Sequence, residues 1–244
     1  MNTHPDRTDQ NDHFESGPHS ETFFGDLSQT EIGLFDSLKI TSSYPKGAVV
    51  FMEGQTSKGI YIVSQGRIKL STCSKNGKMI IMGIAEEGDV LALSETISHS
   101  LHIATADALV PSQVTFVASK DFLRFIEQNP GACLKAVKQL SRIYNTACLR
   151  IRSLGWSASV ADKLAELFLE WCKTGVTKDD GIHLNFLHTQ EQLAQMIGTS
   201  RETVTRALKD FRSRRLVTGK GAGLIIPDME RLEAAIGNPT LPEG

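Results

Sequence analysis

The fold is decided by residues 188–226, whose sequence is HTQEQLAQMIGTSRETVTRALKDFRSRRLVTGKGAGLII. Thr189 is placed to cap a first helix, and Gly198 ends that helix where the chain needs a tight turn. Ser200 is placed to cap a second helix, which carries apolar residues at helical spacing. Two short helices joined by a glycine-containing turn predict a helix-turn-helix unit.

A strand, a turn and a second strand are predicted directly after this unit. Leu216–Thr218 and Leu224–Ile226 are largely apolar runs, and Gly219–Gly223 between them supplies the turn. This hairpin would form the wing of a winged helix. A plain pair of helices with a solvated charged face is the alternative, but it leaves unexplained why helix, glycine turn, capped basic helix and wing follow in this order.

The outward face of the second predicted helix carries side chains that can contact bases and phosphates. They are Arg201, Glu202, Thr205, Arg206 and Lys209. Arginine can donate two hydrogen bonds to guanine O6 and N7, and glutamate can accept one from cytosine N4. The 244 residues have a formal net charge of only −2, yet residues 201–220 hold seven basic side chains and two acidic ones. A basic segment in a near-neutral chain predicts a local anionic partner, which we take to be double-stranded DNA.

The N-terminal half of the chain has a different pattern. Residues 1–22 are polar and nearly free of apolar side chains, and we expect a disordered tail. A short helix is predicted at residues 29–38, and residues 43–119 are then short segments separated by glycines. Gly66–Leu70 alternates polar and apolar residues as a half-buried strand does, and Asn76 with the glycine after it suits a hairpin turn. Regular short strands predict a β-sandwich or jelly roll.

A long helix is predicted from Pro130 to Leu154, since proline suits the first turn of a helix. Two apolar stripes run along this helix. The first consists of Ala136, Leu140, Ile143, Ala147 and Leu154, and the second of Leu134, Val137, Tyr144, Cys148 and Ile151. One stripe suffices to pack the helix on its own domain, so two stripes favour a homodimer over a helix buried within one domain. We expect the first stripe to form the dimer interface.

Several classes of protein are excluded by motifs that the sequence lacks. No stretch approaches the roughly 18 apolar residues of a membrane helix, and the polar N-terminus has no signal-peptide core, so no membrane partner is expected. The four cysteines show no C-x-x-C spacing, and a cytoplasmic protein with reduced thiols is expected. Walker A, G-x-S-x-G and H-E-x-x-H motifs are missing, so an enzyme is not expected. No metal site is expected, since His4, His13 and His19 fit no ligand spacing.

Two segments together resemble the Crp/Fnr superfamily of bacterial transcription regulators. Residues 46–70, KGAVVFMEGQTSKGIYIVSQGRIKL, resemble the family's cyclic-nucleotide-binding β-roll in their glycine placement and in Tyr61. Residues 200–206, SRETVTR, resemble the recognition helix of the cAMP receptor protein and differ from it at Thr205. The resemblance covers nearly everything after Phe23.

The resemblance implies roles for individual residues. Arg201, Glu202 and Arg206 would read the G, C and G positions of a TGTGA-like half-site, while Thr189 and Ser200 would touch phosphates. The full set of expected DNA contacts is Arg201, Glu202, Arg206, Thr189, Gln190, Ser200, Thr203, Thr205 and Lys209. A homodimer would bind an inverted repeat, and RNA polymerase is a partner implied by the family.

The effector site departs from the family pattern. The family's cyclic-nucleotide pocket has a Gly-Glu pair for the ribose and an Arg-Ser pair for the phosphate, whereas Ala92-Leu93 and His102-Ile103 stand at these places here. A buried phosphate needs a paired cation and leucine cannot bind a ribose hydroxyl, so cAMP binding is not expected and the effector is unknown. An iron–sulfur cluster is not expected either, because no cysteine precedes Cys73. Haem ligation by His99 and His102 is less expected than solvated histidines.

The sequence therefore predicts an α+β protein with an N-terminal cyclic-nucleotide-binding-like β-roll (jelly roll), a long dimerisation helix and a C-terminal winged helix-turn-helix. The expected divisions are a tail at 1–22, an effector or sensor domain at 23–129, the dimerisation helix at 130–154 and the DNA-binding domain at 155–244. The expected function is sequence-specific DNA-binding transcription regulation. The alternative is a small-molecule-binding or redox- or haem-responsive module whose DNA binding is secondary, and the basic recognition helix argues against it.

Overall fold

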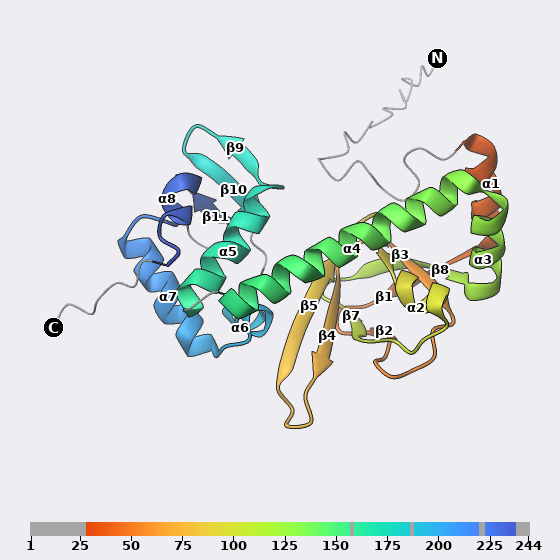
Figure 1. Cartoon of the computed structure of the whole chain (residues 1–244), viewed down its shortest axis with the longest axis horizontal. Helices are drawn as coiled ribbons and strands as arrows, with labels where there is room; N and C mark the ends of the chain where they lie inside the picture. Colours follow the sequence, from red (N-terminus) through yellow and green to blue (C-terminus); the bar gives the residue numbers. More distant parts are fainter. Residues whose placement is uncertain (1–27, 157–158, 186–187, 220–222, 238–244) are drawn as a thin grey trace, which may run out of the picture.

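The computed structural model describes residues 28–156, 159–185, 188–219 and 223–237. The tail expected at residues 1–22 lies outside these ranges. Figure 1 shows an N-terminal β-roll and a C-terminal group of helices with a small sheet, and one long helix that runs along the β-roll to the C-terminal group. The predicted α+β architecture is confirmed.

The β-roll consists of two four-stranded sheets, with the strand orders β1-β8-β3-β6 and β2-β7-β4-β5. The strands are β1 (Lys39–Tyr44), β2 (Val49–Phe51), β3 (Gly59–Gln65), β4 (Ile68–Cys73), β5 (Met79–Ala85), β6 (Val90–Leu91), β7 (Thr105–Ala108) and β8 (Ser112–Ala118). The β4–β5 hairpin turns at Gly77, whose φ of 77° is left-handed and whose N–H donates to the Ser74 carbonyl at 2.9 Å. The predicted turn is therefore confirmed, although the strand before it begins at Ile68 rather than Gly66.

Two short helices belong to the β-roll. Helix α1 (Gln29–Leu38) lies where the sequence predicts it. Helix α2 (Leu93–Ser98) was not predicted and interrupts the series of strands. It is bounded by Ala92 and His99, whose φ angles of 58° and 54° lie in the left-handed region that non-glycine residues seldom adopt.

The β-roll has two hydrophobic clusters, one formed by residues of both sheets and one between a sheet and the helices that cover it. Helix α3 (Ser119–Gln128) contributes Phe122 and Phe125, and the Phe125 ring lies 5.3 Å from that of Phe35 in α1. Helix α4 (Pro130–Trp156) begins at the predicted proline and extends this core with Ala132 and Ala136. Asn129, before the proline, is extended, as steric contact with the proline ring favours.

The two apolar stripes of α4 are used differently from the sequence-based expectation. Ala136 is 2% exposed and packs with Leu140 against the protein's own β-roll, so these two side chains stabilise the protomer itself. Ile143 and Ala147 lie farther along the helix and are exposed, and the side chain of Leu154 lies outside the described part. The second stripe is the outward one: Leu134, Val137, Tyr144, Cys148 and Ile151 are all exposed.

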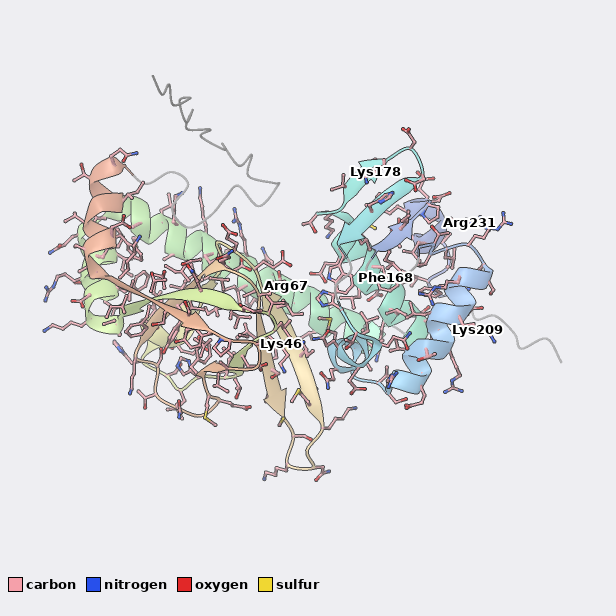
Figure 2. The ribbon with its side chains drawn as sticks, turned by 180° about the vertical axis from the view of Figure 1, so that it is seen from behind. Lys46, Arg67, Phe168, Lys178, Lys209 and Arg231 are labelled. Carbon is pink, nitrogen blue, oxygen red and sulfur yellow. The ribbon has the colours of Figure 1, made fainter. Side chains whose placement is uncertain are left out.

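The C-terminal region begins with α5 (Val160–Cys172) and contains α6 (Gln190–Ile197), α7 (Arg201–Ser213) and α8 (Met229–Glu233). Its sheet has the order β11-β10-β9, from β9 (Val176–Lys178), β10 (Gly181–Asn185) and β11 (Gly223–Ile226). The core includes Leu164, Phe168, Leu193, Leu208 and Phe211, each at most 2% exposed. Figure 2 labels Phe168 within this region.

The predicted wing differs in its pairing. Strand β11 forms its ladder with β10, from Ile182 opposite Ile226 to Asn185 opposite Gly223. The expected first arm of the wing, residues 216–218, contributes only a bridge between Thr218 and Ile225. Residues 220–222 of the expected turn lie outside the described ranges. Within the part of the chain that the structure describes, no helix is long and apolar enough to cross a membrane.

Candidate nucleic-acid interface

The helix-turn-helix is held by local hydrogen bonds at the positions that the sequence predicts. The Thr189 hydroxyl accepts from the Gln192 N–H at 3.1 Å, and the Gln192 side chain accepts from the Thr189 N–H at 2.8 Å, so α6 begins in a capping box. Gly198 ends α6 with a left-handed φ of 71°. The Ser200 hydroxyl accepts from the Thr203 N–H at 3.3 Å and caps α7.

Burial of one face of α7 fixes which side chains its other face presents. Val204, Leu208 and Phe211 are buried in the C-terminal core, against residues that include Leu193 and Ile197 of α6. The opposite face is therefore turned to solvent. It carries Arg201, Glu202, Thr205, Arg206 and Lys209, all exposed. Figure 2 shows Lys209 on the outer surface of the C-terminal region.

A side-chain contact joins the start of α6 to the exposed face of α7. The Thr205 hydroxyl lies 2.6 Å from Gln190 Oε1 and 2.9 Å from the Arg201 carbonyl, and its single proton is shared between these acceptors. Arg206 lies one turn from Thr203, with 3.5 Å between Nη2 and the Thr203 hydroxyl. The structure thus brings Gln190, Thr203, Thr205 and Arg206 together on one surface.

Glu202 remains an ionised hydrogen-bond acceptor on this basic surface. Its pKa lies below the usual value, first because its carboxylate accepts from its own backbone N–H and then from the Ser200 hydroxyl, with Arg201 and Arg206 adding favourable charge. An anionic side chain at this place is repelled by DNA phosphates in general, so it makes sense as an acceptor for a specific donor.

The positions expected to form a degenerate effector pocket are mostly inside the core. Leu93 is 1% exposed and packs with Phe122 and Phe125, while Ala92 is also buried. His102 is 3% exposed and its ring stacks on Phe51, with centroids 4.1 Å apart. Ile103, by contrast, is 61% exposed and does not join the other three.

The sequence did not predict that Phe51, Tyr61 and Glu95 lie near His102. Tyr61 packs against Phe51 with ring centroids 5.1 Å apart, and both rings lie against His102. Burial lowers the pKa of His102, and the nearby carboxylate of Glu95 opposes this in part. Nδ1 of His102 has no hydrogen-bond partner in the structure. Among the described residues, no group of three or more His, Cys, Asp or Glu side chains could hold a metal ion.

We expect His188 to make the stability of the protein depend on pH. The His188 ring lies beside Trp171, with 4.9 Å between the ring centroids. Its pKa is lowered to about 4, first by burial and then by the positive charge of Arg67. The unfolded chain binds a proton at this histidine below about pH 6.5, before the folded protein does, so stability falls as the pH drops from about 6.5 towards 4.

We expect the free energy of unfolding to be about 1–2 kcal/mol lower at pH 5 than at pH 7.5 because of this group, after allowance for the partly exposed ring. Urea titrations of the wild type and His188→Gln at both pH values measure it. The variant should lose less stability than the wild type on acidification. Equal losses in the two proteins would contradict this role of His188.

Comparisons with known proteins agree with this geometry. Residues 162–235 match the Crp-like helix-turn-helix domain family, and residues 41–129 match the cyclic nucleotide-binding domain family. A CRP-like cAMP-activated global transcriptional regulator of Mycobacterium tuberculosis is 27% identical over 192 residues, which cover 78% of this chain and 84% of that protein. A cAMP-activated global transcriptional regulator of Pasteurella multocida is 24% identical, with 75% of this chain and 88% of that protein covered.

Solved structures share the fold at lower sequence identity. A CooA mutant from Carboxydothermus hydrogenoformans superposes with a TM-score of 0.73 at 21% identity, covering 86% of this chain and 90% of that one. FixK2 from Bradyrhizobium japonicum superposes with a TM-score of 0.72 at 18% identity, covering 83% of this chain and 99% of that one. The order of β-roll, long helix and helix-turn-helix agrees with both domain families at once, so this chain belongs to the Crp/Fnr superfamily of DNA-binding transcription regulators.

Proposed function

We propose that this regulator binds an inverted-repeat, TGTGA-like DNA site as a homodimer, through the exposed face of α7. The observation that carries the proposal is the arrangement of Arg201, Glu202 and Arg206 at the capped N-terminal end of a helix whose opposite face is buried. Two guanidinium groups beside one ionised carboxylate match guanine, guanine and cytosine edges in the major groove. Thr189 and Ser200, the two caps, are then available to contact phosphates, as is Lys209.

We infer that the second copy packs on the outward stripe of α4 rather than on the stripe that contains Ala136 and Leu140. The outward side chains Leu134, Val137, Tyr144 and Ile151 are between 56% and 70% exposed. Their spacing of three and seven residues keeps them on one face of the helix, which is typical of a helix–helix seam. In this arrangement residues 23–129 form the sensor domain, residues 130–154 the dimerisation helix and residues 155–244 the DNA-binding domain.

We propose further that the signal is not cAMP, although the relatives from Mycobacterium tuberculosis and Pasteurella multocida are cAMP-activated. Leu93 is part of the core and offers no acceptor for a ribose hydroxyl. His102 packs against the rings of Phe51 and Tyr61, neither of which carries the positive charge that a buried phosphate needs. RNA polymerase as a partner rests on the family resemblance.

The proposed recognition of bases by α7 is tested by replacing two of its basic residues with alanine, one at a time. Arg206→Ala should cost roughly 1–3 kcal/mol on the preferred site and relax the preference at one base pair, because it removes a bidentate base contact. Lys209→Ala should weaken binding to all sequences about equally and flatten the salt dependence, because it removes a phosphate contact. Binding-site selection with the wild type and both variants measures this. If Arg206→Ala lowered affinity equally for every sequence, Arg206 would be a phosphate contact instead.

A further inference from the structure

The β4–β5 hairpin of the β-roll contacts the helix-turn-helix. Lys78, which directly precedes β5, donates from Nζ to the carbonyl oxygen of Gly198 at 3.1 Å, across 120 positions of sequence. Gly198 is the residue that ends α6 and opens the turn to α7. Helix α6 and strand β5 are also in direct contact, and Figure 1 shows α6 beside this hairpin.

A second cation of the β-roll acts near the other end of α6. Arg67, which precedes β4, is close enough to His188 for its charge to influence that ring, and His188 directly precedes the Thr189 cap. Figure 2 labels Arg67 on the side of the β-roll that faces the C-terminal helices. The β-roll therefore reaches the first helix of the helix-turn-helix near both of its ends.

This contact does not cover the exposed face of α7 that is proposed to contact DNA. Arg201, Glu202 and Arg206 remain exposed while the hairpin is in contact with α6 and the turn. The acceptor for Lys78 is a backbone carbonyl in the turn that joins the two helices, so the bond restrains the orientation of α7 relative to the β-roll without using any reading side chain. Contact with the hairpin is thus compatible with contact with DNA.

We propose that Lys78 is a positioning residue for DNA recognition, through which the β4–β5 hairpin fixes the separation of the two recognition helices in the dimer. This rests on the proposed function, because it requires a homodimer on an inverted repeat. A dimer reads two half-sites only when its helices are spaced as the half-sites are. A helix-turn-helix that is held in place gives up less freedom on binding the second half-site, and it tolerates a wrong spacing less well.

The experiment measures how strongly each variant binds inverted repeats whose half-sites are separated by spacers of different length. Wild type, Lys78→Met, Lys78→Arg and Lys75→Met are titrated against inverted repeats whose central spacer is shortened or lengthened by one and two base pairs, and against a single half-site. Lys75 is an exposed lysine of the same hairpin turn, so its replacement removes an equal charge as a matched control. Thermal unfolding of each variant confirms that it is folded.

Lys78→Met should bind the optimal spacer about three- to tenfold more weakly, as expected for the loss of one exposed charged hydrogen bond, and should bind the other spacers with nearly unchanged affinity. Its affinity for a single half-site should equal that of the wild type. Lys78→Arg should restore the spacer preference, and Lys75→Met should keep it.

Three results would overturn the inference. An unchanged spacer profile in Lys78→Met would show that the contact does not position the recognition helices. Equal losses on every spacer and on the half-site, in both Lys78→Met and Lys75→Met, would show that these lysines act only through charge on the phosphates. A wild type without any spacer preference would instead contradict the proposed inverted-repeat dimer itself, and the inference would fall with it.

Discussion

Replacing Phe168 by alanine is expected to lower the free energy of unfolding of the C-terminal region by about 3–5 kcal/mol. The Phe168 ring is fully buried on the side of α5 that faces α7. Its centroid lies 5.8 Å from the ring centroid of Trp171 and 6.3 Å from that of Phe211. Truncation therefore leaves a cavity behind the exposed face of α7, which is the proposed DNA-binding surface. A loss of this size is a large part of the 5–15 kcal/mol that stabilises a typical domain.

Urea unfolding followed by circular dichroism measures this change, and DNA binding should be lost at lower urea concentration in the variant. Phe168→Leu is the matched control, because it keeps most of the buried volume and should cost about 1–1.5 kcal/mol. A loss below about 1 kcal/mol for the alanine variant would show that the C-terminal core does not depend on this ring.

Replacing Val137 by lysine is expected to convert the proposed homodimer into monomers and to weaken binding to an inverted repeat by about 100-fold or more. The side chain is 56% exposed on the outward stripe of α4, so the lysine should not disturb the fold of the protomer. In a dimer seam it would bury a charge without a partner. Loss of the second recognition helix removes the gain from binding two half-sites at once, which commonly reaches 10²–10⁴.

Light scattering and DNA titration measure the two effects. Thr146→Lys is the control, because nine residues at 100° each place it about 180° from Val137 around the helix axis. It should remain dimeric and bind as the wild type does. A Val137→Lys protein with dimer mass would show that the outward stripe is not the interface. Leu140→Lys would be a poor test, because Leu140 packs against the protomer's own core.

The elements that the sequence predicted well are those specified by local chemistry. Thr189 and Ser200 cap their helices, and Gly198 adopts the left-handed conformation, because each needs only neighbours within a few residues. Pro130 likewise marks the start of α4. The predicted helix-turn-helix follows from these signals alone, without knowledge of the rest of the fold.

The features that the sequence did not predict depend on distant partners. Whether Ala136 or Val137 faces the protomer's own core is decided by the side of α4 on which the β-roll lies, and both stripes have helical spacing. The stacking of His102 on Phe51 joins residues from separate parts of the β-roll. The bond from Lys78 to Gly198 spans both halves of the chain and ends on a backbone oxygen, which no side-chain pattern reveals.

The unbroken length of α4 has a mechanical consequence. Its 27 residues form a helix about 40 Å long that packs on the β-roll near one end and meets the C-terminal region at the other. About 24 Å of the helix lies beyond Leu140, so a tilt of about 8° there would displace the far end by about 3.4 Å, which is the rise of one base pair. A small change in the packing of Ala132 and Ala136 against the β-roll would therefore become a larger displacement at the end of α4 that meets the C-terminal region.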